Sequence, residues 1–528
     1  MKDSSSEAHP AVTAPDERRG AWPRWIAPTV LLMVVFAINF AAMPATWWAG
    51  DPSAWREETR SLLRDGALHV NTQYAEHIGY PGQYFVFNAG KGLWYSKYGL
   101  MNSLMAVPPT ALESAIHGRI PGVGERSDLL IFNLYNILLS LLVCGLLYRI
   151  TGWYTDRTWV QVVYVLCAFY ATFFWYYQRA QGAEIYQVLF FTAAFYFLVI
   201  YLRGLVKTDG VPSAADRGSL VAAWFFVAAL VLTRLAFGLL IPMVWLAVVY
   251  AVLNLEKSRR ARVLRQQVGW LLLPALVIVA ALASINWIKF GKPWLTGYHI
   301  WHRQDNWPTG RWQDGIWGLL FDPQASMLLH FPVLIFGLLA LREFWRRYKL
   351  DTVVMFLLPS ALFLFLAKTP IWRGEWTYGP RYLIFMLPVL AMPFVAYLEW
   401  LVARPWRRVR LALAVITVVA LGYSTWLQYQ VNRLDFWTMY RVFFTFDGGW
   451  TQDMSRYFFD HQMGTFNADL IRHKDDLDDL PFVAELKKRG LTGQRLEEYK
   501  KLLRGFVDQE NFYWKRAPSS APPPTNGH

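Results

Sequence analysis

The sequence predicts an all-helical protein that crosses a membrane many times, and three observations lead to this fold class. First, 55% of the 528 residues are apolar and only 17% are charged, whereas globular chains average about 45–50% and about 25%. Second, apolar runs of membrane-spanning length recur along most of the chain. Third, basic residues gather in alternate connecting segments. The high aromatic content and the lack of a short repeat exclude disordered and fibrous classes.

The predicted spans begin after a polar tail. Residues 1–24 are rich in Pro, Ala and Ser, so we expect a disordered cytoplasmic tail. The run 26–47 is long enough to span a bilayer and is followed by no small-residue cleavage site, which indicates a retained helix rather than a cleaved signal. Further runs bring the total to about eleven transmembrane helices: 129–148, 159–177, 185–202, 219–233, 236–254, 267–288, 327–341, 352–367, 382–403 and 410–428.

The charge distribution predicts which ends of these helices face the cytoplasm. If successive helices cross the membrane in opposite directions, the short loops on one side of the membrane contain only two basic residues, Arg179 and Arg234. By the positive-inside rule, the N-terminus is then cytoplasmic and the C-terminus lies outside the plasma (inner) membrane. The same loops account for the net charge of +14, so no nucleic-acid partner is expected. Basic residues crowd the loops of the other side: 149–157, 203–218, 255–266, 342–350 and 404–410.

Three outer segments are long: 48–127, 289–325 and 430–528. The first contains an apolar stretch, 98–112, that two prolines interrupt, which favours an interfacial helix. The last predicts a small external helical domain, 431–514, followed by a disordered tail, 515–528. One of its helices should begin near Pro481 and end near Gly490, and a second should place four apolar residues on one face: Leu496, Tyr499, Leu503 and Phe506.

Two acids lie at the outer ends of predicted spans, where a carboxylate is costly and therefore a candidate for function. Asp51 follows the first helix, and Glu184 lies in the turn between the third and fourth helices. Both should face the same side at the same depth. The alternatives are a solvated acid at a helix end for Asp51 and a favourable helix-dipole contact for Glu184.

Candidate cations lie at the same level. Arg381 and Tyr378 belong to an aromatic cluster, 372–382, at the outer start of the tenth helix, where free amides and a guanidinium suit a phosphate. Arg234 lies at an outer break between two short helices, and Lys97 lies in the first outer segment. The alternative for the cluster is an interfacial aromatic belt with snorkelling arginine.

Metal and nucleotide sites have weak signals. His299 and His302 have helical spacing and could bind a metal, although histidines in a Trp-rich loop more often lie at the headgroup level. Cys144 and Cys167 both lie inside apolar runs, so neither a disulfide nor a metal site is expected of them. The sequence contains no nucleotide-binding glycine loop and no serine nucleophile elbow.

In order along residues 25–430, several short motifs resemble the GT-C superfamily of polytopic glycosyltransferases. Within it, the resemblance is to the bacterial branch near the protein O-mannosyltransferases and the lipid A aminoarabinose transferases. The motifs are Gly50-Asp51, Ser61–Gly66, Tyr95-Ser-Lys-Tyr-Gly99, Glu184, Thr233-Arg234, Phe290–Pro293 with Thr296-Gly-Tyr298, Gly318–Pro323 and Trp376–Tyr382.

The resemblance implies transfer of a sugar from a polyprenyl-phosphate donor to an acceptor lipid, glycan or protein on the outer face. It also implies that an acid of the first outer loop is the catalytic base. Many family members have Asp-Glu there, whereas Asp51 is followed by Pro52 and then by Glu57 and Glu58. The base is therefore Asp51 or one of these glutamates. No cofactor is certain beyond the lipid-linked donor, and a divalent metal remains an option.

Two other functions are compatible with a polytopic membrane protein. A transporter or flippase of lipid-linked glycans would favour unwound helices and polar residues at mid-membrane over acids crowded at one face. A GT-C-like scaffold without catalysis would only bind a lipid phosphate, and the interrupted Asp-Glu pair keeps this option open.

Overall fold

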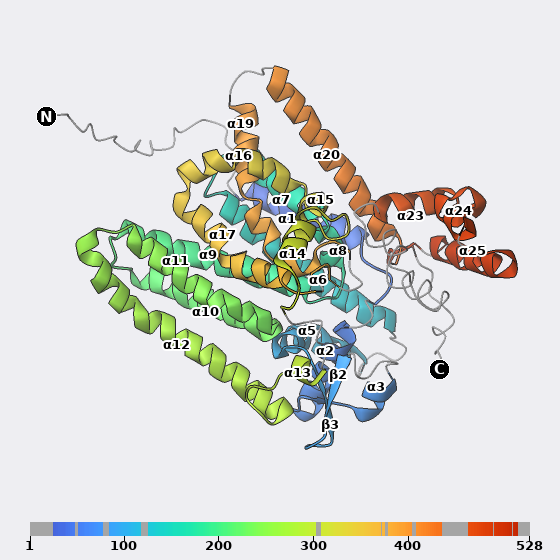
Figure 1. The fold of residues 1–528 in the computed structure, drawn as a ribbon, viewed down its shortest axis with the longest axis horizontal. Helices are drawn as coiled ribbons and strands as arrows, with labels where there is room; N and C mark the ends of the chain where they lie inside the picture. The colour runs from blue at the N-terminus through green and yellow to red at the C-terminus, as the bar shows by residue number, and fades with distance from the viewer. Residues whose placement is uncertain are drawn as a thin grey trace.

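The structure is a computed structural model and confirms the all-helical class. Figure 1 shows long helices side by side, with α2, α3, α5, α13 and a few short strands at one end and α23, α24 and α25 beside the end of α20. The structure describes residues 25–47, 51–77, 84–117, 125–301, 308–370, 372–374, 378–403, 408–435, 463–488, 490–508 and 510–515.

Within these ranges, seven helices are long and apolar enough to cross a membrane. Three shorter apolar helices accompany them: α1 (Ile26–Ala41), α7 (Thr158–Tyr170) and α18–α19 (Leu387–Val402). Every predicted run contains helix. The seven long helices are α6 (Glu125–Thr151), α9 (Glu184–Lys207), α10 (Ala214–Thr233), η1 with α11 (Leu235–Leu253), α12 (Lys257–Phe290), α17 (Lys349–Ala367) and α20 (Arg408–Arg433).

Several predicted runs are not single helices, and proline accounts for most of the breaks because it lacks the N–H that a helix interior needs. The first helix ends at Ala41, before Pro44. The expectation of one continuous tenth helix is wrong. That run is divided into η3 (Arg381–Leu383), α18 (Leu387–Leu390) and α19 (Pro393–Val402), with Pro388 and Pro393 at the starts of the last two. Two other runs are likewise split, into α7 with α8 (Phe174–Arg179), and into α15 (Met327–His330) with α16 (Val333–Arg347).

The centre of the bundle is α9, which packs against α6, α10, α11 and α17 and is buried along most of its length. At the periphery, α12 and α20 expose most of their apolar side chains, for example Leu273 and Val418. Such exposed apolar faces suit contact with lipid, because the bilayer core is as apolar as the protein interior. Polytopic membrane architecture thus follows from both the composition and the packing.

The described part of the segment after α1 contains three helices and a small sheet, of which the sequence analysis predicted only the helix with the two prolines. Helix α5 (Leu100–His117) continues through both prolines, Pro108 and Pro109. The strands β1, β3 and β2 are antiparallel in that order, with Val86 opposite Tyr95. The elements are α2 (Asp51–Asp65), β1 (His69–Val70), α3 (Thr72–His77), β2 (Phe85–Asn88), β3 (Leu93–Ser96) and α5.

Short helices also occupy the other long segments. Before α15 lie α13 (Gly297–Trp301) and α14 (Trp312–Phe321). The predicted C-terminal helices are present, as α24 (Pro481–Lys488) and α25 (Gly493–Val507), and all four apolar residues of the predicted face of α25 are buried. They accompany α23 (Met463–Arg472), which packs on α20, and η4 (Leu477–Asp479).

One arginine joins the C-terminal segment to the bundle. Arg179 of α8 donates to the carbonyl of Ala42 after α1, to that of Asn432 in α20 and to that of Asn511, the last two at 2.9 and 2.8 Å. The ends of α1, α8 and α20 therefore meet at one place. Two contacts join the segment after α1 to other helix ends: Asn102 donates to the carbonyl of Thr233 at the end of α10, and Lys289 at the end of α12 donates to the carbonyl of Ser96.

Candidate active site

The predicted acid Asp51 is the first residue of α2, and its side chain is 26% exposed. A carboxylate at this position is favoured by the free N–H groups and the dipole of the helix. The hydroxyl of Tyr98 donates to its Oδ1, and Nη2 of Arg381 donates to its Oδ2 at 3.0 Å. The carboxylate is thus held from two sides and still reachable from outside.

Arg381 joins the two acids that the sequence analysis selected. Its Nε donates to Glu184, the first residue of α9, whose side chain is only 1% exposed. One buried guanidinium therefore bridges carboxylates at the starts of two helices. The expectation that Arg381 begins a regular helix with free amides for a phosphate is wrong, because η3 is a three-residue 3-10 turn.

Two further predicted cations lie close to Asp51. Lys97 is 7% exposed, and its ammonium lies 5.2 Å from the ring centroid of Tyr98 and 5.8 Å from that of Tyr298. Arg234 adopts an extended backbone between α10 and η1, and its guanidinium lies 4.6 Å over the ring of Tyr382. We name Asp51, Glu184, Arg381, Lys97 and Arg234 the Asp51 cluster.

These charges set the ionisation of Asp51. Burial alone raises its pKa, but the attractions of Arg381 and Lys97, the hydrogen bond from Tyr98 and the attraction of Arg234 together outweigh burial and lower the pKa. The same surroundings raise the pKa of Tyr98 well above its usual value, chiefly through burial and then through the charge of Asp51. At neutral pH, Asp51 is therefore a carboxylate and Tyr98 a hydrogen-bond donor.

The structure places the other candidate acids apart from the Asp51 cluster. Glu57 lies on α2 with Arg60 as its ion partner at 3.5 Å. Glu58 is fully buried and paired with Lys289 of α12, and burial raises its pKa despite the lysine. Tyr378 is also buried, where its hydroxyl accepts a hydrogen bond from Gln428 of α20 at 3.0 Å.

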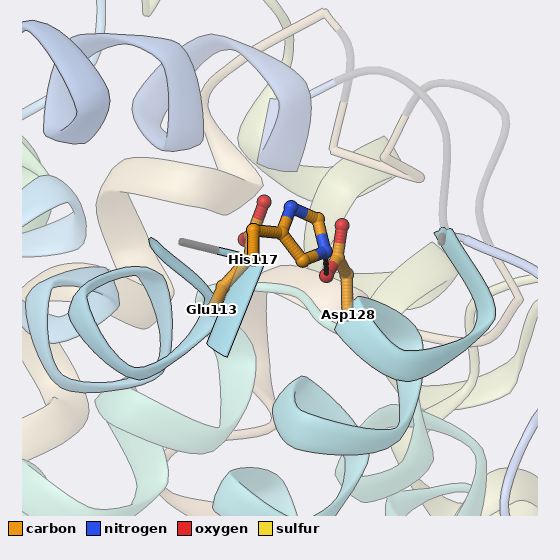
Figure 2. Close-up of side chains that lie close together, drawn as sticks. All are labelled: Glu113, His117 and Asp128. Carbon is orange, nitrogen blue, oxygen red and sulfur yellow. Dashed lines mark ion pairs between the residues drawn. The ribbon is translucent and has the colours of Figure 1, made fainter. Parts of the chain in front are cut away.

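The predicted histidine pair cannot be tested as a unit, because His302 lies outside the described residues. Nδ1 of His299 lies 2.7 Å from the hydroxyl of Thr296 within α13 and its preceding turn. A different group of metal-binding residue types occurs where α5 meets α6. Figure 2 shows the ring of His117 between the carboxylates of Glu113 and Asp128, and their ligand atoms all lie within 4.8 Å of one another.

Two arginines of α2 already neutralise this group. Arg56 and Arg60 donate to the two oxygens of Glu113 at 2.9 and 2.8 Å. Nε2 of His117 lies 2.8 Å from Asp128, and Arg56 lies 3.6 Å from the other oxygen of that acid. A divalent cation would have to compete with two guanidinium charges for the same carboxylates. We name these five residues the Glu113 network and interpret it as a tie between α2, α5 and α6.

Sequence reasoning missed residues that position the site. Tyr98 lies in a quoted motif, but its contact with Asp51 depends on how two loops meet. Tyr298 packs edge-on against Tyr98, from a segment 200 residues further along the chain. Lys289 gave no signal, because a lysine at the end of an apolar run usually extends to the membrane interface.

Comparison with known proteins adds the fold family. No family profile matches the sequence, and no curated protein is significantly similar. Among solved structures, ArnT from Cupriavidus metallidurans bound to undecaprenyl phosphate matches with a TM-score of 0.50 and 14% identity, over 92% of this chain and 76% of that one. The oligosaccharyltransferase AglB from Archaeoglobus fulgidus, with an inhibitory peptide and a dolichol-phosphate, gives 0.49 and 13%, over 95% and 62%. Its complex with Zn and sulfate gives 0.49 and 14%, over 93% and 59%.

At this identity, the likeness to ArnT establishes the fold alone. The protein shares the fold of ArnT, which confirms, at the level of the fold, the resemblance drawn from the sequence. The two oligosaccharyltransferase structures are longer chains, of which this chain covers less than two thirds.

Proposed function

We propose that this protein is a membrane glycosyltransferase that moves a sugar from a polyprenyl-phosphate donor to an acceptor hydroxyl. One observation carries the proposal: a partly exposed carboxylate, Asp51, lies among three cations at one end of membrane-crossing helices. Such a transfer needs a base and a positive site for a phosphate beside the lipid phase. The GT-C fold shared with ArnT, which was solved with undecaprenyl phosphate, supports the same class.

Asp51 is the proposed base. Its lowered pKa keeps it ionised, and its exposed fraction of 26% lets an acceptor hydroxyl reach it. As the acceptor oxygen bonds to the anomeric carbon, the hydroxyl proton passes to Asp51. Glu184 is too buried for this role, and we assign it the orientation of Arg381.

The cations of the Asp51 cluster are the proposed site for the leaving phosphate. When the bond between the anomeric carbon and the phosphate oxygen breaks, negative charge grows on the lipid phosphate. Arg381, Lys97 and Arg234 carry fixed positive charges that favour this change, and their effect is large because the site is poorly solvated. No cofactor beyond the lipid-linked donor is required for these steps.

The orientation in the membrane is part of the proposal. The basic loops favour an orientation with the N-terminus in the cytoplasm and the Asp51 cluster on the outer face of the inner membrane. The partners are then the lipid-linked donor, the surrounding membrane lipids, and an acceptor lipid, glycan or protein. Cysteine labelling of residues 463–515 in intact cells should succeed from outside, and labelling only from the cytoplasm would contradict this orientation.

The activity is tested by incubating the purified protein with polyprenyl-phosphate hexoses and a membrane extract, followed by mass analysis. We expect hexose-bearing products with the wild type and with Asp65→Asn, a control that removes an exposed acid from the same helix. Asp51→Asn should form almost none. Equal amounts of product with both variants would show that Asp51 is not the catalytic base.

Two outcomes would favour the other functions. Binding of undecaprenyl phosphate without any product would indicate a scaffold that has lost catalysis. Movement of a lipid-linked glycan across vesicles containing the protein, again without a new glycosidic bond, would indicate a flippase. Either result would contradict the proposed transfer.

A further inference from the structure

A fully buried ion pair lies beneath the Asp51 cluster. Glu58 of α2 is 0% exposed, and Lys289 in the last turn of α12 is 1% exposed. Burying two charges is costly, and replacing such a pair by apolar side chains of similar volume is often neutral or stabilising. Stability alone therefore does not account for this pair.

The contacts of Lys289 show what the pair holds. An ammonium group has three N–H donors, and three acceptors surround this one. Besides Glu58, they are the carbonyl of Ser96 at 3.2 Å and the carbonyl of Tyr98 at 3.3 Å. The hydroxyl of Ser103 on α5 donates to the other oxygen of Glu58 at 2.6 Å. The pair thus joins α2, α5 and α12 to the backbone of the turn 96–99.

This turn is closely packed on two other sides. A Cβ atom on Gly99 would lie 2.1 Å from the carbonyl oxygen of Leu232 in α10, so only glycine permits this approach. A Cβ atom on Gly297 would lie 2.5 Å from the Cα of Lys97. The turn is therefore confined between the end of α10 and the start of α13, and Lys289 holds its carbonyl groups.

The turn carries two residues of the site. Tyr98 donates its hydroxyl to Asp51, and Lys97 is one of the cations that keep Asp51 ionised. A shift of this turn would move both side chains relative to Asp51, whereas Arg381, Glu184 and Arg234 come from other elements and would stay.

We propose that the Glu58–Lys289 ion pair is a positioning device, which fixes the turn 96–99 so that Lys97 and Tyr98 flank Asp51. Glu58 is then a positioning residue and not the base. The inference rests on the proposed function for its consequence in donor binding, but the geometry it describes can be tested without any substrate.

The first experiment measures binding of undecaprenyl phosphate to the purified protein by native mass spectrometry. Lys289→Met should weaken binding about tenfold, since the turn loses a charged partner. The double variant Glu58→Met/Lys289→Met leaves no orphaned charge, so it should remain folded by melting temperature and gel filtration and should still bind weakly. Lys292→Met, which removes an exposed lysine three residues away, should bind as the wild type does.

The double variant separates positioning from simple stability. If the pair served stability only, removing both charges would restore wild-type binding, and that result would overturn the inference. If the wild type itself does not bind undecaprenyl phosphate, the proposed function is wrong, and a second measurement decides the inference by itself.

That measurement is the infrared carboxylate signal of Asp51, isolated as the difference between each protein and its Asp51→Asn counterpart. Tyr98→Phe shows the signal of Asp51 without its tyrosine donor. We expect Lys289→Met and the double variant to reproduce the Tyr98→Phe signal, and Lys292→Met to reproduce the wild type. A wild-type signal in the double variant would contradict the inference, whatever the activity.

Discussion

Helix α2 takes part in two clusters of carboxylates and cations that differ in charge and exposure, one through Asp51 at its start and the other through Arg56 and Arg60 further along. In the Asp51 cluster, three cations face two carboxylates, and one carboxylate is 26% exposed. In the Glu113 network, Arg56 and Arg60 match Glu113 and Asp128 in charge, and both carboxylates are only 6% exposed. An excess of positive charge beside an open carboxylate suits an anionic ligand, whereas a balanced and closed network suits a structural role.

The largest difference is expected when one acid of each cluster is neutralised. Asp51→Asn should lower turnover by about 10²–10⁴-fold, the usual loss for an acid–base group, with a melting temperature near that of the wild type. Glu113→Gln should leave turnover close to the wild type and lower the stability by about 1–3 kcal/mol, because two arginines lose a charged acceptor. Turnover and thermal melts of both variants test this, and the reverse pattern would exchange the two roles.

A smaller effect is expected from Arg381→Lys. Lysine keeps the charge but cannot bridge Asp51 and Glu184 as the planar guanidinium does. We expect undecaprenyl phosphate to bind about tenfold more weakly, as titration followed by native mass spectrometry would show. Arg373→Lys is the matched control, since Arg373 is exposed and pairs with Asp322. Unchanged affinity in Arg381→Lys would indicate that Arg234 and Lys97, and not Arg381, bind the phosphate.

The pH dependence should shift by a modest amount when one cation is removed. Nearby cations favour the ionised form of Asp51, so its pKa lies below the ordinary 3.8 and activity should fall only in more acidic solution. Lys97→Met removes one such charge, which raises the pKa of Asp51 and moves the loss of activity to higher pH. Profiles of kcat/KM against pH test this, with Lys91→Met on the β2–β3 turn as the control. A shift toward lower pH would contradict the electrostatic role of Lys97.

The smallest effect is expected from added metal. Because Arg56 and Arg60 already neutralise the Glu113 network, Zn²⁺ should not raise the melting temperature of the protein measurably. A rise that is absent in His117→Gln would show that the three residues of Figure 2 bind the metal despite the arginines.

The fold was largely predictable because long apolar runs and loop charges follow directly from the bilayer. Each predicted run contains helix, and the structure brings together Asp51, Glu184 and Arg381, which were chosen as charged residues at helix ends. The helix breaks were not predicted, although Pro388 and Pro393 could have suggested them.

The partners within the site could not be predicted. Lys289 meets the carbonyls of Ser96 and Tyr98 from 193 and 191 residues away in sequence, and Tyr98 reaches Asp51 from 47 residues away. Such contacts depend on how loops pack against one another, and hydrophobic periodicity says nothing about that. The strands themselves were missed because each is only two to four residues long.

The contacts of Arg179 and Asn511 also have a consequence in time. The side chain of Asn511 accepts a hydrogen bond from the backbone of Ala45, 466 residues earlier, and Arg179 binds the carbonyls of Ala42 and Asn511 together. At a synthesis rate of 5–20 residues per second, roughly 25–90 seconds separate the two partners. The residues that directly follow the first helix therefore cannot complete these contacts until almost all of the membrane domain has been synthesised.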